Sequence, residues 1–321
     1  MSQLQLDLSS DTAAHTAPVA AGPTMAQRPG GRVGPPTDRL MILAARALGR
    51  ARSRWAETSH GRVHALEVEG TGQGAAVLIH GFSSTGAHLL PLMRHLRGGF
   101  ARLIAPDLPG HGLTPTLPDD GDGPSRAGVA ALAEALASWV DAPAVVFGSS
   151  LGGLAAVRYA LAEPARVRAL VLSSPAGAPM DEADLAAFQE GFRVRTHGDA
   201  LGFVDRVMDT HALARHVLAW GVRRRFARPA LRAIIEGARS EDLLTRGELL
   251  RLSMPVLCLW GERDRVLAPA ARDFYRSALP PHARFERLAA LGHGPYLERP
   301  DVVARRIRAF TDALAARGGR A

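Results

Sequence analysis

From residue 62 onward the chain alternates short strand-like runs with amphipathic helical stretches. Apolar strands that alternate with helices in this way predict an α/β fold with a doubly wound, mainly parallel sheet. The expected strands are Val63–Val68, Ala76–His80, Arg102–Asp107, Val145–Phe147, Val167–Ser173, Val256–Trp260 and Arg284–Leu288. The expected helices between them are Gly86–Arg97, Arg126–Val140, Leu151–Ala162 and Pro269–Ala278.

The alternation is interrupted between Ala178 and Leu252, where successive helical stretches follow one another without a strand. An uninterrupted helical segment inside an α/β pattern indicates an insertion. We therefore expect residues 178–252 to form a helical cap, inserted into an α/β core made of residues 57–177 and 253–321.

The N-terminal region differs from the rest of the chain. Residues 1–36 are rich in Ala, Pro, Gly, Ser and Thr, so a disordered tail is expected. Residues 37–56 predict a basic amphipathic helix. Its arginine stripe is Arg39, Arg46, Arg50 and Arg54, and its apolar face is Leu40, Ala44, Ala47, Leu48, Ala51 and Trp55. This helix either packs on the core or makes a peripheral membrane contact through residues 38–55.

Residue counts exclude several kinds of chemistry. All 39 basic residues are Arg, and without Lys there is neither a Walker-A nucleotide site nor a pyridoxal Schiff base. The chain has no Asn, so it has no Cys-His-Asn triad, and its one cysteine, Cys258, sits in an apolar run. The net charge is +8, but the arginines are scattered with few aromatic residues among them, so no nucleic-acid partner is expected. Without a signal-peptide pattern, a cytoplasmic location is expected, with membrane association as the alternative.

The strongest chemical signal is Gly148-Ser149-Ser150-Leu151-Gly152-Gly153, which lies between an expected strand and an expected helix. A G-x-S-x-G motif in that context is typical of a nucleophile elbow, in which the central serine is exposed on a strained turn. The glycines centre the motif on Ser150. The alternative is that Ser150 is an ordinary helix N-cap.

A serine nucleophile needs a base and a group that orients the base. His293 lies between two glycines after the last expected strand, and Asp264 follows the strand Val256–Trp260. The order Ser150, Asp264, His293 predicts a catalytic triad, with Glu262 as the rival acid. The competing histidines are His80, His111, His197, His211 and His216. The first two precede the elbow, which is the wrong chain order, and the others fall in the cap segment.

The remaining requirement is an oxyanion hole, whose backbone N–H donors each contribute about 3 kcal/mol to the transition state. One donor is the amide that follows the nucleophile, Leu151. The second is expected in the loop after the strand Ala76–His80, where Phe82 is the candidate.

These motifs occur in the order seen in the α/β-hydrolase superfamily, which the chain resembles over about residues 60–315. They are His80-Gly81-Phe82, Asp107-Leu108-Pro109-Gly110-His111-Gly112, the elbow, Gly261–Asp264 and Gly292-His293. Within the superfamily the chain resembles the monoacylglycerol-lipase-like and small bacterial esterase branch. The resemblance implies that His80 and the turn 109–112 are structural, and that residues 178–252 form a lid over the acyl pocket.

We therefore expect a serine hydrolase that cleaves hydrophobic carboxylic esters, of medium chain length or monoacylglycerol type, without a metal or an organic cofactor. A carbon–carbon hydrolase of ring-cleavage products is the alternative, although its usual His-Gly-x-Gly-Pro-Gly loop is replaced by His80–Thr85 and its Asn before the serine by Ser149. A catalytically silent binding protein on the same fold is the third interpretation.

Overall fold

The structure is a computed structural model that describes residues 36–49, 51–117, 124–209 and 212–318. The expected N-terminal tail, residues 1–36, lies outside the described residues except for Pro36, which begins the first helix. None of the helices in these four ranges is long and apolar enough to cross a membrane.

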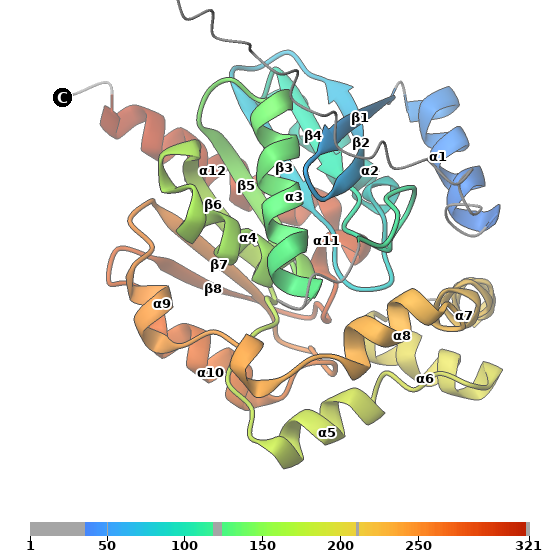
Figure 1. Cartoon of the computed structure of the whole chain (residues 1–321). Coiled ribbons are helices and arrows are strands. Elements are labelled where there is room, and N and C mark those ends of the chain that lie inside the picture. The colour runs from blue at the N-terminus through green and yellow to red at the C-terminus, as the bar shows by residue number, and fades with distance from the viewer. Residues whose placement is uncertain (1–35, 50, 118–123, 210–211, 319–321) are drawn as a thin grey trace, which may run out of the picture. The chain divides into compact units, whose positions relative to one another are not determined.

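Eight strands form one sheet in the order β1-β2-β4-β3-β5-β6-β7-β8 (Figure 1). The pairs β1–β2 and β2–β4 are antiparallel and the other neighbouring pairs are parallel, which confirms the expected mainly parallel α/β sheet. The strands are β1 (Arg52–Thr58), β2 (Gly61–Glu69), β3 (Ala75–Ile79), β4 (Arg102–Pro106), β5 (Ala144–Ser149), β6 (Val167–Ser173), β7 (Val256–Gly261) and β8 (Arg284–Leu288).

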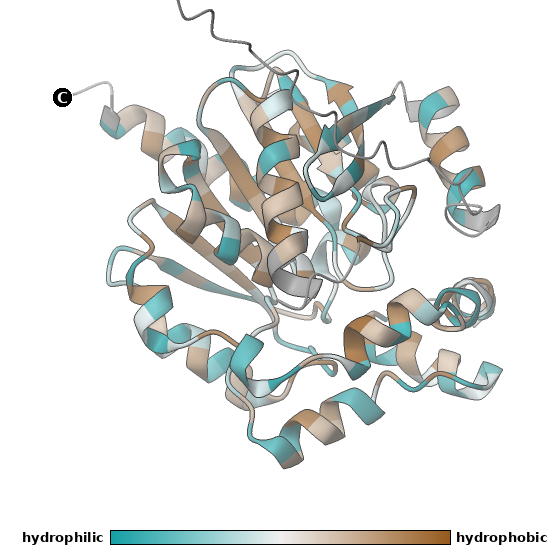
Figure 2. Cartoon of the chain, viewed as in Figure 1, coloured by the Kyte–Doolittle hydropathy of each residue, from teal (hydrophilic) through white to brown (hydrophobic). Residues whose placement is uncertain are grey.

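Helices cover both faces of the sheet, because neighbouring residues of each central strand point to opposite sides. Val146 of β5 packs with α3 (Pro124–Trp139), α4 (Leu151–Ala162) and α10 (Pro269–Ala278). Val145 and Phe147 pack on the other side, where the covering helices are α1 (Pro36–Gly49), α2 (Leu90–Leu96), α11 (Pro295–Glu298) and α12 (Pro300–Gly318). The central strands are accordingly hydrophobic, whereas the edge strand β8 is largely hydrophilic (Figure 2).

Between β6 and β7 the described chain is helical. The helices are α5 (Glu182–Glu190), α6 (His197–Val207), α7 (Ala212–Phe226), α8 (Pro229–Glu236) and α9 (Arg246–Leu250). Three short 3₁₀ helices complete the described elements: η1 (Gly86–Leu89), η2 (Pro164–Arg166) and η3 (Ser240–Asp242). Helices α5 to α8 lie together beyond the carboxyl ends of the central strands (Figure 1). They therefore stand where ligands bind in sheets of this kind.

The expected helix over residues 37–56 is wrong in its second half. Helix α1 ends at Gly49, and Arg52–Thr58 form the edge strand β1, which pairs antiparallel with β2 across a two-residue turn. Glycine at a helix end commonly stops the helix. The strand that follows gains ladder hydrogen bonds to β2, which a helix in its place would not make.

The predicted apolar face is wrong within the helix itself, although Ala51, which follows the helix, is buried in the core. Leu40, Ala44 and Ala47 are exposed, with Leu40 retaining 65% of its surface, whereas Ile42 and Ala45 are buried and Met41 packs against the core. If alanine is counted as apolar, a helical projection of this segment has several faces that are about equally apolar. Contacts with the rest of the protein decide which of these faces is buried.

Candidate active site

Ser150 occupies the turn between β5 and α4. Its backbone angles are φ 53° and ψ −121°, a strained conformation for a residue with a side chain. Its side chain makes no cap hydrogen bond to α4, so the structure does not support the interpretation of Ser150 as an ordinary helix N-cap. A serine held in this way presents its hydroxyl away from the helix backbone, as a nucleophile elbow requires.

The two glycines of the motif are there because the backbone is crowded. A Cβ atom at Gly148 would collide with the carbonyl oxygen of Gly152, and one at Gly152 would collide with the carbonyl oxygens of Ile79 and His80. Any side chain at either position would push α4 away from β3 and β5. The turn that strains Ser150 therefore depends on both glycines.

His293 and Asp264 meet at the same edge of the sheet. The Nδ1 atom of His293 lies 2.8 Å from Oδ2 of Asp264, and both side chains are largely buried. The other carboxylate oxygen, Oδ1, accepts hydrogen bonds from the backbone N–H groups of Val266 and Leu267 at 2.9 and 3.0 Å. Burial alone would raise the pKa of Asp264, but the His293 ring and these hydrogen bonds outweigh burial and lower the pKa. The carboxylate therefore stays ionised beside the imidazole.

The rival groups have other partners. Glu262 pairs with Arg287 at 3.0 Å on the surface, so it is not the acid beside His293. Among the cap histidines, His197 and His216 are exposed and lie 3.0 Å from each other. His211 lies outside the described residues. Of the acids and histidines considered from the sequence, the structure thus joins Asp264 with His293.

The loop that carries Phe82 passes directly beside the elbow. A Cβ atom at Gly81 would lie 3.2 Å from the Cβ of Ser150. Leu151 is the first residue of α4, where backbone N–H groups have no acceptor within the helix. The loop at Gly81 and Phe82 and the first residue of α4, Leu151, therefore lie next to Ser150 on two different elements, where an oxyanion hole would need its donors.

Two buried histidines hold this loop in place. The Nε2 atom of His80 accepts a hydrogen bond from the N–H of Leu108 at 3.0 Å, and Nε2 of His111 accepts one from the N–H of Ser83 at 3.2 Å. Asp107 also supports the loop, since its carboxylate accepts from the N–H of Gly86 at 2.7 Å. His80 and His111 therefore act on loop geometry in this structure, as the family resemblance implies.

A cavity of about 150 Å³ connects these groups with the cap segment, and both Ser150 and His293 line it. Its apolar lining includes Phe82, Phe192, Phe203, Val207, Leu218 and Val222. Apart from Phe82, these residues lie in α6, in α7 or just after α5. The volume is below the range of about 300–1,000 Å³ for pockets that enclose a drug-sized ligand.

Aromatic rings join the oxyanion loop to the cap. The ring of Phe82 lies 5.5 Å from that of Phe192 and 5.3 Å from that of Phe226, both edge-on. Phe203 of α6 lies 4.9 Å from Phe226 of α7. Such pairs add to the burial energy, so a displacement of α6 or α7 is expected to disturb Phe82 directly.

Several polar residues that line this cavity were not assigned a role from the sequence, among them Ser84, His88, Arg225 and Tyr296. His88 lies five residues after Ser83 in the same loop region, and Tyr296 lies three residues after His293. Their proximity to motif residues was the available signal. Arg225 gave none, because it comes from α7 and meets the site only through the packing of the cap.

Several known proteins are similar to this chain in sequence or in fold. The alpha/beta hydrolase family model matches residues 76–306. A pimeloyl-(acyl-carrier protein) methyl ester esterase of Stenotrophomonas maltophilia is 34% identical over 268 residues, covering 79% of this chain and 99% of that protein. Lipase 1 of Psychrobacter immobilis is 28% identical over 249 residues, covering 75% and 77%. The crystal structure of a membrane phospholipase A superposes with a TM-score of 0.74 at 25% identity, covering 87% of this chain and 93% of the other.

The matched family segment spans the elbow, Asp264 and His293, and the named relatives extend over about three quarters of the chain. The chain therefore belongs to the alpha/beta hydrolase family, among its esterase- and lipase-like members.

Proposed function

We propose that the protein hydrolyses uncharged carboxylic esters through an acyl-enzyme formed on Ser150. One observation carries this proposal: a strained serine and a histidine bonded to a buried aspartate line the same cavity. The alternative roles for each residue, as a cap, a surface ion pair or a loop histidine, do not account for a cavity lined by both Ser150 and the histidine that is paired with Asp264. Substrates of medium acyl length, including monoacylglycerol-type esters, suit the apolar lining.

In the first step, the Ser150 oxygen attacks the ester carbonyl carbon while His293 takes the hydroxyl proton at Nε2. Asp264 holds the Nδ1 proton and stabilises the imidazolium that forms. The amides of Phe82 and Leu151 donate to the oxyanion of the tetrahedral intermediate. When the intermediate collapses, the ester C–O bond breaks, and His293 returns the proton to the departing alcohol.

In the second step, water replaces the alcohol and attacks the acyl-serine carbonyl, giving its proton to His293. Collapse of this second intermediate breaks the bond to Ser150, which regains its proton, and releases the carboxylic acid. The net reaction consumes one ester and one water and yields one alcohol and one acid. This sequence uses only groups of the chain and water.

The test is hydrolysis of p-nitrophenyl esters from C2 to C16 by the wild type and by Ser150→Ala. We expect turnover to peak at one chain length, and the variant to lose at least about 10⁴-fold in kcat, because residues of a serine triad act as a unit. A fluorophosphonate probe should add its mass to the wild type and leave the Ser150→Ala protein unmodified.

Ser149→Ala is the matched control, since it removes the neighbouring hydroxyl from the end of β5 and leaves the elbow serine. It should stay within about tenfold of the wild type. A folded Ser150→Ala protein that keeps more than a tenth of the activity contradicts the proposal. Absence of ester turnover in a folded wild type would favour the carbon–carbon hydrolase instead.

We further propose that α1 and α7 contact an anionic lipid surface. Leu40 and Leu43 of α1 are 65% and 55% exposed. On α7, Leu213, Val217 and Trp220 are 81%, 65% and 48% exposed and recur at the spacing of one helix face. Exposed apolar side chains in this arrangement favour insertion into a bilayer interface.

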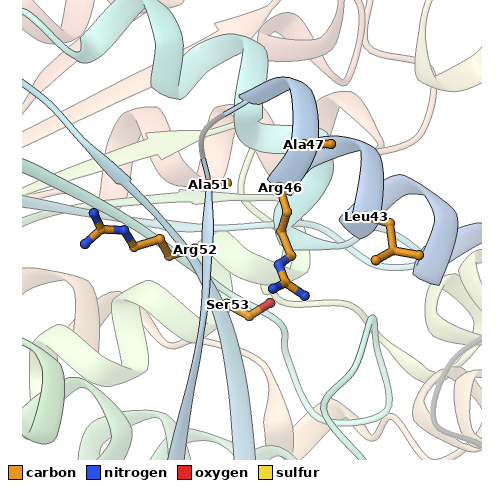
Figure 3. Close-up of a pocket in the computed structure, with 6 residues that line it drawn as sticks. All are labelled: Leu43, Arg46, Ala47, Ala51, Arg52 and Ser53. Carbon is orange, nitrogen blue, oxygen red and sulfur yellow. The ribbon is translucent and has the colours of Figure 1, made fainter.

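The charge of these two helices supports a lipid surface over a second copy of the chain. Helix α7 contains no acidic residue, and the one acid of α1, Asp38, is buried against Arg225 at 2.9 Å. Arg46 extends from α1 toward Ser53, beside a shallow groove that Leu43 also lines (Figure 3). Two such cationic surfaces would repel each other, whereas anionic headgroups attract both.

A further inference from the structure

The catalytic cavity has polar side chains that the proposed acyl transfer does not use. Ser84 follows the oxyanion loop, His88 lies in η1 and Tyr296 lies in α11, and all three line the cavity that contains Ser150 and His293. Polar groups in a buried cavity cost free energy unless they are hydrogen-bonded. Their presence in a largely apolar pocket therefore requires an explanation.

His88 presents a neutral donor. Its Nδ1 atom accepts a hydrogen bond from the backbone N–H of Thr85 at 3.2 Å, so the ring proton of the neutral imidazole is on Nε2. Burial, with the charge of Arg225 nearby, lowers the pKa of His88 to about 3. The ring therefore remains uncharged under ordinary conditions, with an N–H donor on the nitrogen that Thr85 does not occupy.

Ser84 and Tyr296 provide two hydroxyl groups. The Oγ atom of Ser84 is buried and lies near the Tyr296 hydroxyl, with no other hydrogen-bond partner among the described residues. Tyr296 is 3% exposed, with its ring edge-on to Phe147 at 5.9 Å. Burial raises the pKa of Tyr296 to about 12, and the neighbouring Ser84 hydroxyl offsets only part of this effect. Both hydroxyls therefore stay neutral and can donate or accept.

The arginine that lines the cavity already has a carboxylate partner. Arg225 lines the cavity, but its guanidinium binds the carboxylate of Asp38 through Nε and Nη2, both at 2.9 Å. A carboxylate of a substrate would have to compete with Asp38 for this arginine, and it would otherwise be buried against neutral donors alone. Burying a charge without a partner is strongly unfavourable.

We propose that Ser84, His88 and Tyr296 form a subsite for an uncharged oxygen of the substrate, a hydroxyl, ether or carbonyl oxygen separate from the scissile ester. This inference rests on the proposed function, because it concerns the ester that Ser150 attacks. An ester with such an oxygen satisfies the donors. A purely alkyl ester of the same size displaces water from them and leaves them unpaired.

The test compares two pairs of esters that are nearly identical in size. The first pair, 2-hydroxyethyl octanoate and propyl octanoate, places the hydroxyl on the alcohol side. The second pair, ethyl 8-hydroxyoctanoate and ethyl nonanoate, places it on the acyl side. In one of the pairs the hydroxylated ester should have a kcat/KM at least about tenfold higher, which corresponds to about one hydrogen bond. The pair that responds identifies which part of the substrate reaches the subsite.

Tyr296→Phe and His88→Leu should bring this ratio down to within about threefold of one, mainly through KM of the hydroxylated ester. Tyr159→Phe is the matched control, since it removes a buried phenol hydroxyl from α4, where the ring packs in the core away from the cavity. It should leave the ratio as in the wild type. Circular dichroism and a thermal melt establish that each variant is folded.

The outcomes separate this inference from the proposed function. Ser150-dependent cleavage with a ratio near one for both pairs overturns the subsite and leaves the esterase standing. An unchanged ratio in both Tyr296→Phe and His88→Leu also overturns it. Failure of the wild type to cleave any of the four esters counts against the proposed function itself.

Discussion

At Asp264, burial and hydrogen bonding act in opposite directions on one carboxylate. Burial favours its protonated form, while the His293 ring and the N–H groups of Val266 and Leu267 favour the ionised form and lower its pKa. The ionised form fixes the tautomer of His293, because it accepts from Nδ1–H and leaves Nε2 free to take a proton.

Asp264→Asn is therefore expected to keep the turn and lose the chemistry. The amide oxygen can still accept from the backbone of residues 266 and 267, but the amide nitrogen next to His293 favours the tautomer with its proton on Nε2. We expect kcat to fall by about 10⁴-fold, measured with the p-nitrophenyl ester that the wild type cleaves best. Glu262→Gln, on the same turn, should have little effect. A larger loss in Glu262→Gln than in Asp264→Asn would contradict the assignment.

The residues of the proposed triad could be predicted because each lies beside a short motif at the end of an expected strand. Parallel strands bring their carboxyl ends to one edge, so the topology alone places Ser150, Asp264 and His293 near one another. The residues of the proposed subsite could not be predicted in this way. His88 and Tyr296 lie near motif residues in the sequence, but they line one cavity because α11 packs next to η1, and no local pattern in the sequence encodes that contact.

Among the elements, β1 and α1 show where local patterns fail. Arg54 continues the four-residue spacing of Arg46 and Arg50, so helical periodicity alone predicts that the helix extends through residues 52–56. Their actual state depends on β2, which offers a ladder of partners across the turn at Ser59 and His60. Similarly, the buried side of α1 is the side of Ile42 and Ala45, because the core has room for these two side chains. A helical projection of the sequence contains no information about that space.

The exposed face of α1 leads to a prediction about membrane binding. Leu40→Ser combined with Leu43→Ser should lower binding to vesicles of phosphatidylcholine and phosphatidylglycerol by about tenfold or more, because each leucine loses apolar contact with the bilayer. Sedimentation with the vesicles measures this effect. Leu250→Ser is the matched control, since Leu250 is 46% exposed but lies on α9.

Point variants are preferable to removal of the N-terminus. Truncation through residue 55 would remove half of β1 and leave Arg225, which is 7% exposed, without Asp38. A buried charge without its partner destabilises a protein by about 3–5 kcal/mol. Equal sedimentation of the Leu40/Leu43 variant and the wild type contradicts the lipid contact. A wild-type dimer that the same substitutions dissociate would favour a second copy of the chain as the partner.

For the whole molecule, buried histidines make stability depend on pH. Burial lowers the pKa of His80, and it lowers the pKa of His88 and His111 to about 3. In the unfolded chain these side chains have a pKa near 6.5. Below pH 6.5 the unfolded state therefore binds more protons than the folded state. The free energy of unfolding then decreases as the pH falls from about 6.5 toward 3, and is unaffected by these groups above pH 7.

His111 is the residue at which this effect can be isolated, since its ring is 1% exposed. A histidine with these two pKa values lowers the free energy of unfolding by about 2 kcal/mol between pH 7 and pH 5. His111→Gln is expected to be less stable than the wild type at pH 7 because the Ser83 contact is altered, but to lose about 2 kcal/mol less on going to pH 5. Asp107 and Glu67, whose pKa values are lowered, change little in this window because they titrate below it. Urea unfolding at pH 7, 6 and 5 measures both curves, and parallel curves for the two proteins would show that His111 does not couple folding to protons.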